Sequence, residues 1–561
     1  MSLCRRAGCS LAGSALLVLA ACSGGPKADL VLYGRVWTGD SARPYAAAVA
    51  VRGDSIVAVG DSAMVARMVG GSTTVLAPPG GFVAPGFMDD HVHLLSGGFQ
   101  LASVDLRDAA TPEEFTRRIK VFAQTLKPGE WITGGDWDHE KWPGTPLPDR
   151  AWIDSVTPQN PVFVNRLDGH MALANSLALA AARLDRAARE IPGGTIVRRA
   201  GRELSGVLKD EAMNPVFAAI PAPSPSQLDS ALARAMTHAA SLGVVGVSSV
   251  STGWNDIAAL QRARARGALT LRVSNYIPLA AWREMAESLK AGGPGDDWIR
   301  SAGVKGFVDG SLGSTTALMF APYLDAPATR GLFVTPEDSL RRWIGAADSA
   351  GLQVAVHAIG DRANALLLDI YDSVAKAHGP RDRRFRIEHA QHLRAQDLPR
   401  FGAQGVIPSM QPYHEADDGR WAAKRIRPDL IKGTYAFRSL LDSKARLAFG
   451  SDWTVAPLDP LVGMQAAVTR QTLDGKNPEG WVPEQKVSID EALRSYTVNN
   501  AYAVFAESRR GMLKPGFLAD LVVLDRDLTR IPPTSLADAR VIATVVGGKL
   551  VYRKEPGPGS R

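Results

Sequence analysis

A His-Val-His motif is the part of this sequence whose residue types and spacing point most directly to chemistry. His91 and His93 follow an apolar run, residues 82–88, that is typical of a buried β-strand. Successive side chains of a strand point to opposite faces, so residues two apart point the same way. Neutral imidazole is the commonest protein ligand for divalent transition metals. The motif therefore predicts two ligands of a metal site, although such a pair alone is also typical of a polar strand edge.

Further side chains that can bind metal or transfer protons follow apolar runs downstream. They are Lys305 in VKGFVDGS, His357 in VAVHAIGD, His389 in RIEHAQH and Asp452 in AFGSDW. Taken alone, each has an ordinary structural explanation, such as a buried core histidine or a helix N-cap. Four of the ten histidines at predicted strand ends, with a lysine and an aspartate in register, instead indicate one polar site.

Eight strand-like runs must position these side chains. The runs are residues 82–89, 243–250, 271–278, 304–309, 353–357, 384–389, 405–411 and 446–452. Helical stretches lie between them, and eight such units predict an α/β fold, a distorted (β/α)8 TIM barrel over residues 82–508. Active sites of these barrels lie at the C-terminal ends of the strands. The candidate ligands should therefore meet at the mouth of the barrel.

The interval between the first two predicted strands, residues 94–242, is much longer than one helical crossover requires. It contains further strand-like runs at residues 131–133 and 161–164. We therefore expect an insertion after the first strand.

Both ends of the chain carry short alternating apolar runs that are typical of β-strands. These are residues 30–32, 48–51 and 56–60 near one end, and 519–524, 541–546 and 549–551 near the other. We expect the two ends, residues 29–81 and 509–553, to build one small β-sandwich together.

The first residues have the pattern of an export signal. Arg5 and Arg6 precede an apolar stretch, residues 11–21, that is too short to span a bilayer. The end of this stretch, LAAC, resembles the lipobox of bacterial lipoproteins, in which Cys22 is lipidated after removal of residues 1–21. A lipoprotein signal peptide is the reading we favour, and a plain cleaved signal with a coincidental cysteine is the alternative.

The residues around the expected cleavage point bear on location and on metal chemistry. Ser23 follows the cysteine where Asp would favour the inner membrane, so we expect an outer-membrane lipid anchor facing the periplasm, with residues 22–28 as a tether. The three cysteines, Cys4, Cys9 and Cys22, all lie at or before this point. The mature body would then have no disulfide and no thiolate ligand.

The charge pattern argues against a nucleic-acid partner. The net charge is +7, but 64 basic residues are interspersed with 57 acidic ones. The densest basic run, residues 381–386, is short and is typical of a solvated loop. We expect a small-molecule substrate as the partner and leave a homodimer open.

Nine strings in order carry a resemblance to a known family. They are PGFMDDHVHL, GGDWDHEKWPGTPLPDR, LDGHMALANSLAL, VKGFVDGSLGS, VAVHAIGD, RIEHAQH, SMQPYHEADD, AFGSDW and LKPGFLADLVVLD. With these strings the chain resembles the amidohydrolase superfamily, and more closely its amidohydrolase-3, YtcJ-like branch. The resemblance covers almost the whole mature chain and says little about the substrate.

The resemblance implies a metal site with one or two divalent ions. His91, His93 and Asp452 look like ligands of one ion, and His357 and His389 like ligands of a second. Lys305 would bridge both as a carbamate formed with carbon dioxide, which requires a neutral amine. A mononuclear site with Lys305 unbound is the alternative. Zn²⁺ suits a ligand set that is rich in imidazole and lacks sulfur.

The implied reaction is hydrolysis of a carbon–nitrogen bond other than a peptide bond, in an amide, N-acyl or formamide group. A metal-bound hydroxide would attack the carbonyl, and Asp452 would act as general base and then as general acid. His170 of LDGHMALANS, His414 of SMQPYHEADD and Asp309 are the residues that we assign to substrate contact.

Two alternatives stay open from the sequence. The same site could hydrolyse an ester, a lactone or a phosphotriester, because hydroxide attacks those groups as well. The chain could also be a catalytically inactive, lipid-anchored periplasmic binding protein, although a pure binder needs no proton-transferring Asp452. Related sequences often read GSRTA where residues 313–317 read GSTTA. This change removes a cation and makes a strongly acidic substrate less expected there.

Overall fold

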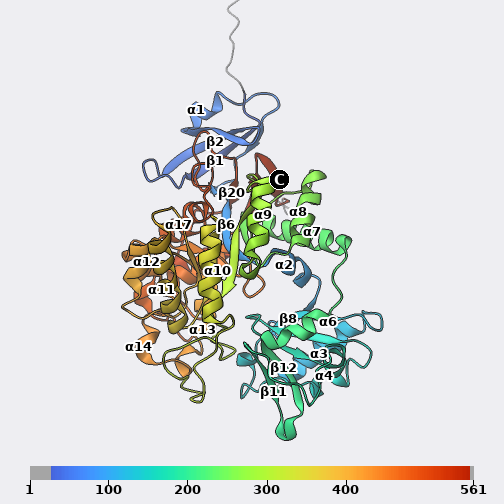
Figure 1. The fold of residues 1–561 in the computed structure, drawn as a ribbon. Helices are drawn as coiled ribbons and strands as arrows, with labels where there is room; N and C mark the ends of the chain where they lie inside the picture. The colour runs from blue at the N-terminus through green and yellow to red at the C-terminus, as the bar shows by residue number, and fades with distance from the viewer. Residues whose placement is uncertain (1–26, 556–561) are drawn as a thin grey trace, which may run out of the picture.

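The computed structural model describes residues 27–555, which form a barrel, a sheet built from both chain ends and an inserted lobe (Figure 1). The predicted signal peptide and Cys22 lie outside the described residues. Within residues 27–555, every helix is too short or too polar to cross a bilayer.

The centre of the molecule is an eight-stranded parallel sheet. Its strand order is β19-β18-β17-β16-β15-β14-β13-β6, and a single parallel bridge between Val92 and Trp453 joins its two edges. The strands are β6 (Phe87–Val92), β13 (Val244–Val250), β14 (Arg272–Pro278), β15 (Ile299–Phe307), β16 (Gln353–Ala358), β17 (Arg386–His389), β18 (Ile407–Met410) and β19 (Ala448–Phe449). The sheet is thus a nearly closed barrel, and the predicted distorted (β/α)8 fold is confirmed.

Helices surround this barrel, and one of them, α13 (Pro412–Asp418), lies at its mouth. The others are α2 (Leu94–Gln100), α7 (Pro225–Ser241), α8 (Trp254–Ala265), α9 (Trp282–Gly292), α10 (Glu337–Ser349), α11 (Asp361–His378), α12 (Leu398–Gln404), α14 (Pro428–Ile431), α15 (Phe437–Asp442), α16 (Pro460–Thr469), α17 (Ile489–Ser495) and α18 (Val498–Ala503). Buried residues of α11, such as Leu367, Ile370 and Val374, recur every three or four positions. This spacing gives the helix one apolar face for the barrel.

The two chain ends build one hydrogen-bonded sheet at the top of Figure 1. Its strands are β1 (Leu30–Trp37), β2 (Tyr45–Arg52), β3 (Ser55–Gly60), β4 (Thr74–Leu76), β5 (Phe82–Pro85), β20 (Leu521–Leu524), β21 (Val541–Val546) and β22 (Lys549–Arg553), with the short helix α1 (Ser62–Ala66) beside them. Leu32, Val49, Leu521 and Val545 share one core. The sheet therefore joins residues from opposite ends of the sequence.

The predicted first barrel strand, residues 82–89, is in fact two strands of two different sheets. β5 pairs with β1 and β20 of the end sheet, while β6 pairs with β13 of the barrel. Gly86 lies between them, where a Cβ atom would stand 2.2 Å from Val245 Cγ1. All side chains of both strands are buried, so the apolar run continues through the change of partner.

The insertion folds as a lobe with its own six-stranded sheet, in the order β11-β12-β10-β9-β8-β7. The strands are β7 (Val104–Asp105), β8 (Ile132–Trp137), β9 (Val162–Arg166), β10 (Met171–Ala174), β11 (Gly194–Arg198) and β12 (Leu204–Asp210), and the helices are α3 (Pro112–Ala123), α4 (Ala151–Asp154), α5 (Ser176–Ala181) and α6 (Asn214–Ala219). The lobe covers a shorter part of the sequence than the predicted insertion, residues 94–242. At the two ends of that range, α2 and α7 pack on each other beside β13 and belong to the barrel wall.

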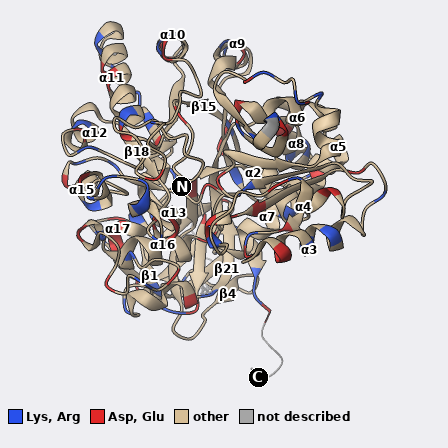
Figure 2. Ribbon diagram, turned by 90° about the horizontal axis from the view of Figure 1, so that it is seen from below, with Lys and Arg blue, Asp and Glu red and all other residues tan. Residues whose placement is uncertain are grey.

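Charged residues of both signs are mixed over the helices seen from below (Figure 2). Many form ion pairs on the helix surface, such as Arg341 with Glu337 and Lys376 with Asp372.

Candidate active site

The side chains expected at the barrel mouth come from the strand ends. His91 lies near the end of β6, His357 in β16 and His389 at the end of β17, while Asp452 follows β19. Ring centroids lie 4.9 Å apart for His91 and His389, and 4.6 Å apart for His357 and His389. The fold therefore brings together residues that are far apart in the sequence.

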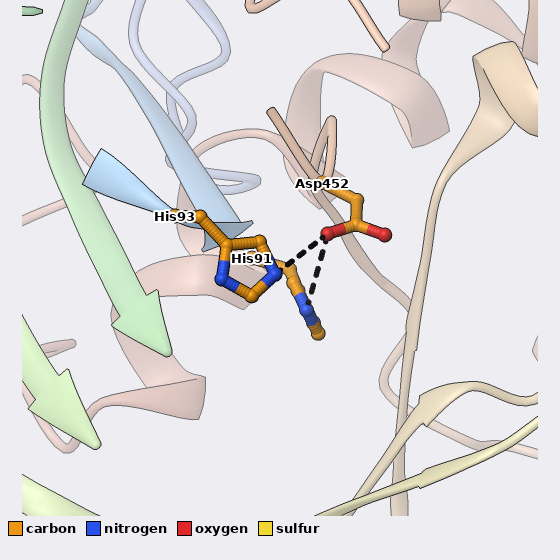
Figure 3. A group of neighbouring side chains, drawn as sticks. All are labelled: His91, His93 and Asp452. Atoms are coloured by element: carbon orange, nitrogen blue, oxygen red, sulfur yellow. Dashed lines mark ion pairs between the residues drawn. The ribbon is translucent and has the colours of Figure 1, made fainter. Parts of the chain in front are cut away.

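Three side chains of the site converge on one point, those of His91, His93 and Asp452 (Figure 3). Asp452 Oδ1 lies 3.4 Å from His91 Nε2 and 3.3 Å from His93 Nε2. Each of the three offers one ligand atom, and these atoms lie within 4.8 Å of one another. Two imidazoles and a carboxylate in this arrangement can hold a divalent cation.

Glu388 fixes the orientation of His91. The Nδ1–H of His91 donates to Glu388 Oε2, which leaves the lone pair on Nε2, and Nε2 is buried without a hydrogen-bond partner. Glu388 also accepts from Arg386 Nε at 2.8 Å. Burial opposes ionisation of Glu388, but Arg386 and His91 lower its pKa below the usual range. A carboxylate behind a histidine is the usual device for aiming a metal ligand.

His357 and His389 are aimed in a similar way. His357 Nε2–H donates to the carbonyl of Gly310 at 3.0 Å, so Nδ1 keeps its lone pair and is buried without a partner. His389 Nδ1–H donates to Gln411 Oε1 at 2.8 Å, which leaves Nε2 free. Burial lowers the pKa of both rings well below the ordinary value. Both imidazoles are therefore neutral and can donate electrons to a cation.

A second group of possible ligands contains His414. Ligand atoms of His389, His414 and Asp452 lie within 4.8 Å of one another, and His414 Nε2 is buried without a hydrogen-bond partner. His414 lies in α13, at the C-terminal side of β18. The structure thus places this residue, which we assigned to substrate contact, close to the same carboxylate as the candidate metal ligands.

Lys305 lies inside the barrel and is 2% exposed. Its Nζ stands 4.0 Å from the centroid of the Phe307 ring. Burial lowers the pKa of Lys305 to about 8, while the charges of Glu388 and Asp452 act in the opposite direction. A fraction of the amine is then neutral at physiological pH, as carbamate formation requires.

Asp452 has a backbone conformation that few residues adopt, with φ of 58°. Its N–H donates to the carbonyl of His91 at 2.7 Å, which ties the chain after β19 to β6. Burial raises the pKa of Asp452, but His91, His93 and His389 lower it well below the ordinary value. Asp452 is therefore an ionised carboxylate at the centre of the site.

The site opens into a cavity that both the barrel and the lobe line. Its barrel residues are Ser311, Leu312, Gly313, His357, Ile359, His389, Gln391, His414, Asp417, Asp418, Trp421, Asp452 and Val455, and its lobe residues are Arg166, Leu167, Asp168 and His170. The ring centroids of His170 and His357 lie 5.0 Å apart. His170 therefore lies where a molecule in the cavity would contact it.

A family model described as "Amidohydrolase family" matches residues 79–552. The chain belongs to this amidohydrolase family. The putative amidohydrolase YtcJ of Bacillus subtilis (strain 168) is 30% identical to it, over 85% of this chain and 90% of that protein. The expected family, with its YtcJ-like relative, is thus confirmed.

Other relatives differ in what their names say. Protein LONG AFTER FAR-RED 3 of Arabidopsis thaliana is 40% identical over 93% of this chain and 91% of that protein. The N-substituted formamide deformylase of Arthrobacter pascens is 26% identical over 94% of this chain and 98% of that protein. The crystal structure of an uncharacterized metal-dependent hydrolase from Pyrococcus horikoshii OT3 has a TM-score of 0.72 and 30% identity, and the match covers 90% of this chain and 99% of that one.

We expected Asp309 to contact the substrate of this amidohydrolase family member. The residues that line the cavity do not include it. Its carboxylate accepts backbone N–H groups of Leu318 at 2.7 Å, Gly360 at 2.8 Å and Ile359 at 3.0 Å. Burial raises its pKa to about 7 despite these bonds. Asp309 therefore holds together the loops that follow β15 and β16.

Two arginines reach the loop 313–317, where the sequence suggested that a cation is missing. A Cβ on Gly313 would lie 2.2 Å from Arg166 Nη1, and Arg425 Nη1 donates to Thr315 Oγ1 at 3.0 Å. Both come from segments distant in sequence, the lobe and the chain after α13. Local sequence around residues 313–317 contains no signal for either.

These arginines are already paired with acids. Arg166 lies 2.7 Å from Asp168 and 3.0 Å from Asp138, and Arg425 lies 2.6 Å from Glu140. Their charges are compensated within the protein. Neither arginine is therefore free to bind a substrate anion, whereas Lys209 Nζ contacts the Ser314 carbonyl of the same loop.

Proposed function

We propose that this protein is a metal-dependent hydrolase of a carbon–nitrogen bond other than a peptide bond, in an amide, N-acyl or formamide group. The observation that carries the proposal is the set of free ligand atoms beside one cavity: His91 Nε2, His357 Nδ1 and Asp452 Oδ1 are all buried without a hydrogen-bond partner. A buried polar atom without a partner costs stability, so such a set is retained for a ligand. Similarity to an N-substituted formamide deformylase supports the bond type.

The residues present fit the metal that the family implies. His91, His93 and Asp452 would hold one ion, and His389 and His357 would hold a second, with His414 close by. Each of His91, His357 and His389 has one nitrogen tied to an acceptor and the other free. Neutral imidazoles and a carboxylate favour zinc, which is the ion we propose.

Bound ions would polarise the substrate carbonyl and lower the pKa of a water molecule towards neutrality. Asp452 lies at the centre of the ligand set with an ionised carboxylate, so it can accept a proton from the attacking water. It can then return that proton to the departing nitrogen, which is the role of a general acid. His170 and His414 lie in or beside the cavity wall and would orient the substrate.

Lys305 is proposed to bridge the two ions as a carbamate. Its burial and its lowered pKa support a neutral amine. The bond would form between Nζ and the carbon of carbon dioxide, and one proton would leave the nitrogen. The product carries two oxygens, which the lysine itself does not have.

Metal analysis combined with a substrate panel tests the function. The purified protein should hold close to one or two zinc ions per chain, and should hydrolyse N-substituted formamides or N-acyl amines. Chelation should abolish turnover and added zinc should restore it. Lys305→Ala should lower the metal content, and short carboxylic acids should partly restore it.

Other outcomes would redirect the proposal. Turnover of esters, lactones or phosphotriesters alone would favour the other hydrolases. Metal-loaded protein that turns over no substrate of the panel, yet binds one tightly, would favour a binding protein. Metal-free protein with full amide turnover would contradict the proposal outright.

We also propose that the mature chain is exported and anchored through a lipid on Cys22, with the body in the periplasm at the outer membrane. The basic, apolar and small-residue pattern before Cys22 supports this. More than one acyl chain makes such anchoring stable. Cys22→Ser should move the protein from the membrane to the soluble fraction. A wild-type protein that fractionates as soluble without detergent would contradict the anchor.

A further inference from the structure

The inserted lobe makes specific contacts with one loop of the barrel mouth. Asp168 Oδ2 accepts the hydroxyl hydrogens of Ser311 at 2.5 Å and Ser314 at 3.2 Å. From the neighbouring strand of the lobe, Lys209 Nζ donates to the carbonyl of Ser314 at 2.8 Å. The turn between β9 and β10 and the end of β12 are therefore both fixed on the loop that follows β15.

Within this contact, His170 and Asp210 form a pair. They face each other across the antiparallel strands β10 and β12, where the Asp210 N–H donates to the His170 carbonyl at 3.1 Å. The His170 Nδ1–H donates to Asp210 Oδ1 at 2.6 Å. Nε2 is therefore the ring nitrogen that His170, a residue of the cavity wall with a side chain 15% exposed, presents to a bound molecule.

Asp210 is held in an unusual backbone conformation to make this contact. Its φ is 47° and its ψ is −128°, which few residues other than glycine adopt. Its side chain is 1% exposed, and its second oxygen, Oδ2, is buried without a hydrogen-bond partner. A strained backbone and an unsatisfied oxygen both cost stability, so a plain structural carboxylate would not be expected here.

The same pair lies beside Gly310, whose carbonyl orients the candidate metal ligand His357. A Cβ on Gly310 would stand 2.0 Å from Thr316 Oγ1 and 2.8 Å from Asp210 Oδ1, so glycine leaves room here for both side chains. The carbonyl of Gly310 accepts from His357 Nε2. The lobe therefore reaches the residue that orients His357 from behind.

We propose that the lobe completes the active site, with His170 as a catalytic residue that hydrogen-bonds the substrate at the reacting group and Asp210 as the positioning residue that fixes the ring of His170. The catalytic role of His170 rests on the proposed function. The orientation of His170 by Asp210 stands on the geometry alone. Asp210 acts only through His170, so its importance must vanish when His170 is absent.

The kinetic test is a double-mutant cycle on a substrate that the panel identifies. His170→Ala should lower kcat/KM by roughly a hundredfold, as a misplaced or lost positioning group does. Asp210→Asn should lower it by about ten- to a hundredfold, the range for residues that orient a functional histidine. In the His170→Ala background, Asp210→Asn should lower it no further, because the two residues act as one unit.

Matched controls separate this role from stability. Asp149→Asn removes an acid that pairs with Arg199 on the same lobe, away from the cavity, and should leave kcat/KM unchanged. Metal content should equal that of the wild type in all variants. An additive loss in the double variant, or wild-type kcat/KM in Asp210→Asn, would overturn the proposal.

A spectroscopic measurement keeps the inference testable if no substrate is found. In protein labelled with ¹⁵N-histidine, the resonances of His170, assigned by their absence in His170→Ala, should show a proton on Nδ1. In Asp210→Asn the Nδ1 resonance should shift. A wild-type His170 without a proton on Nδ1 would refute the positioning role of Asp210, whatever the enzyme hydrolyses.

Discussion

The barrel and the lobe present histidines to the same cavity with different kinds of support. In the barrel, His91 is backed by Glu388 and His389 by Gln411; Glu388 lies in β17 and Gln411 directly follows β18, so both partners belong to the barrel sheet. In the lobe, His170 is backed by Asp210, and the lobe as a whole is held on the barrel by a charged contact. The candidate metal ligands are thus built into the barrel sheet, whereas the expected substrate contact depends on how a separate sheet docks.

The charged contact contains both buried and exposed pairs. Asp138 lies 3.2 Å from Arg420, and Glu140 pairs with Arg425 and with Lys424. The side chain of Glu140 is 2% exposed, whereas that of Lys424 is 40% exposed. Breaking a buried pair leaves an uncompensated charge, while an exposed pair contributes little. Among these charged pairs, the buried ones, Glu140 with Arg425 and Asp138 with Arg420, should therefore contribute most to the docking of the lobe.

Asp452→Asn should have the largest effect, since this residue belongs to the barrel side and is the proposed proton-transfer group. The variant keeps the size and one oxygen ligand but cannot accept a proton, so kcat for amide cleavage should fall by roughly two to four decades. Metal content should fall much less. An ester with a good leaving group should lose less than the amide. Equal losses on both substrates would place the defect in generation of the nucleophile, and near-wild-type amide turnover would remove Asp452 from the mechanism.

Glu388→Gln should have the next largest effect, because it removes the charge that aims His91. The affinity for zinc should fall by about ten- to a hundredfold, as measured by competition with a chelator. Glu507→Gln is the control, because Glu507 pairs with Arg384 away from the cavity. If Glu388→Gln bound zinc as tightly as the wild type, the barrel would not fix its ligands in the way described.

Lys424→Gln should have the smallest effect, and it tests the exposed part of the contact between lobe and barrel. This pair is exposed at the lysine, so the free energy of unfolding should fall by less than about 1 kcal/mol. Turnover and metal content should stay close to wild type. A tenfold loss of kcat/KM at full metal content would instead mean that exposed charges control how the lobe closes on the substrate.

The same contrast explains what the sequence could predict. Metal ligands follow apolar strands, and strand ends of a barrel meet at one mouth, so His91, His357, His389 and Asp452 could be assigned to one site from local patterns. Glu388 could not, because its contact with His91 joins β17 to β6 across the barrel.

The lobe was less predictable for a physical reason. Arg166 and Asp210 lie in segments whose local pattern is that of ordinary strands, and only the docking of one sheet on another brings them to the cavity. Asp309, which we assigned to substrate contact, is a different case. It follows a barrel strand, and its two oxygens accept backbone N–H groups of the neighbouring loops.

The sheet built from both chain ends has a consequence for the order in which the protein can form. β5 lies between β1 and β20, and β20 begins only at Leu521. A ribosome that adds about 5–20 residues per second needs roughly tens of seconds to make the chain between them. Until then, one edge of β5 and the apolar core around Val83 have no partner. The first sheet of the chain can therefore close only after its last strands have been made.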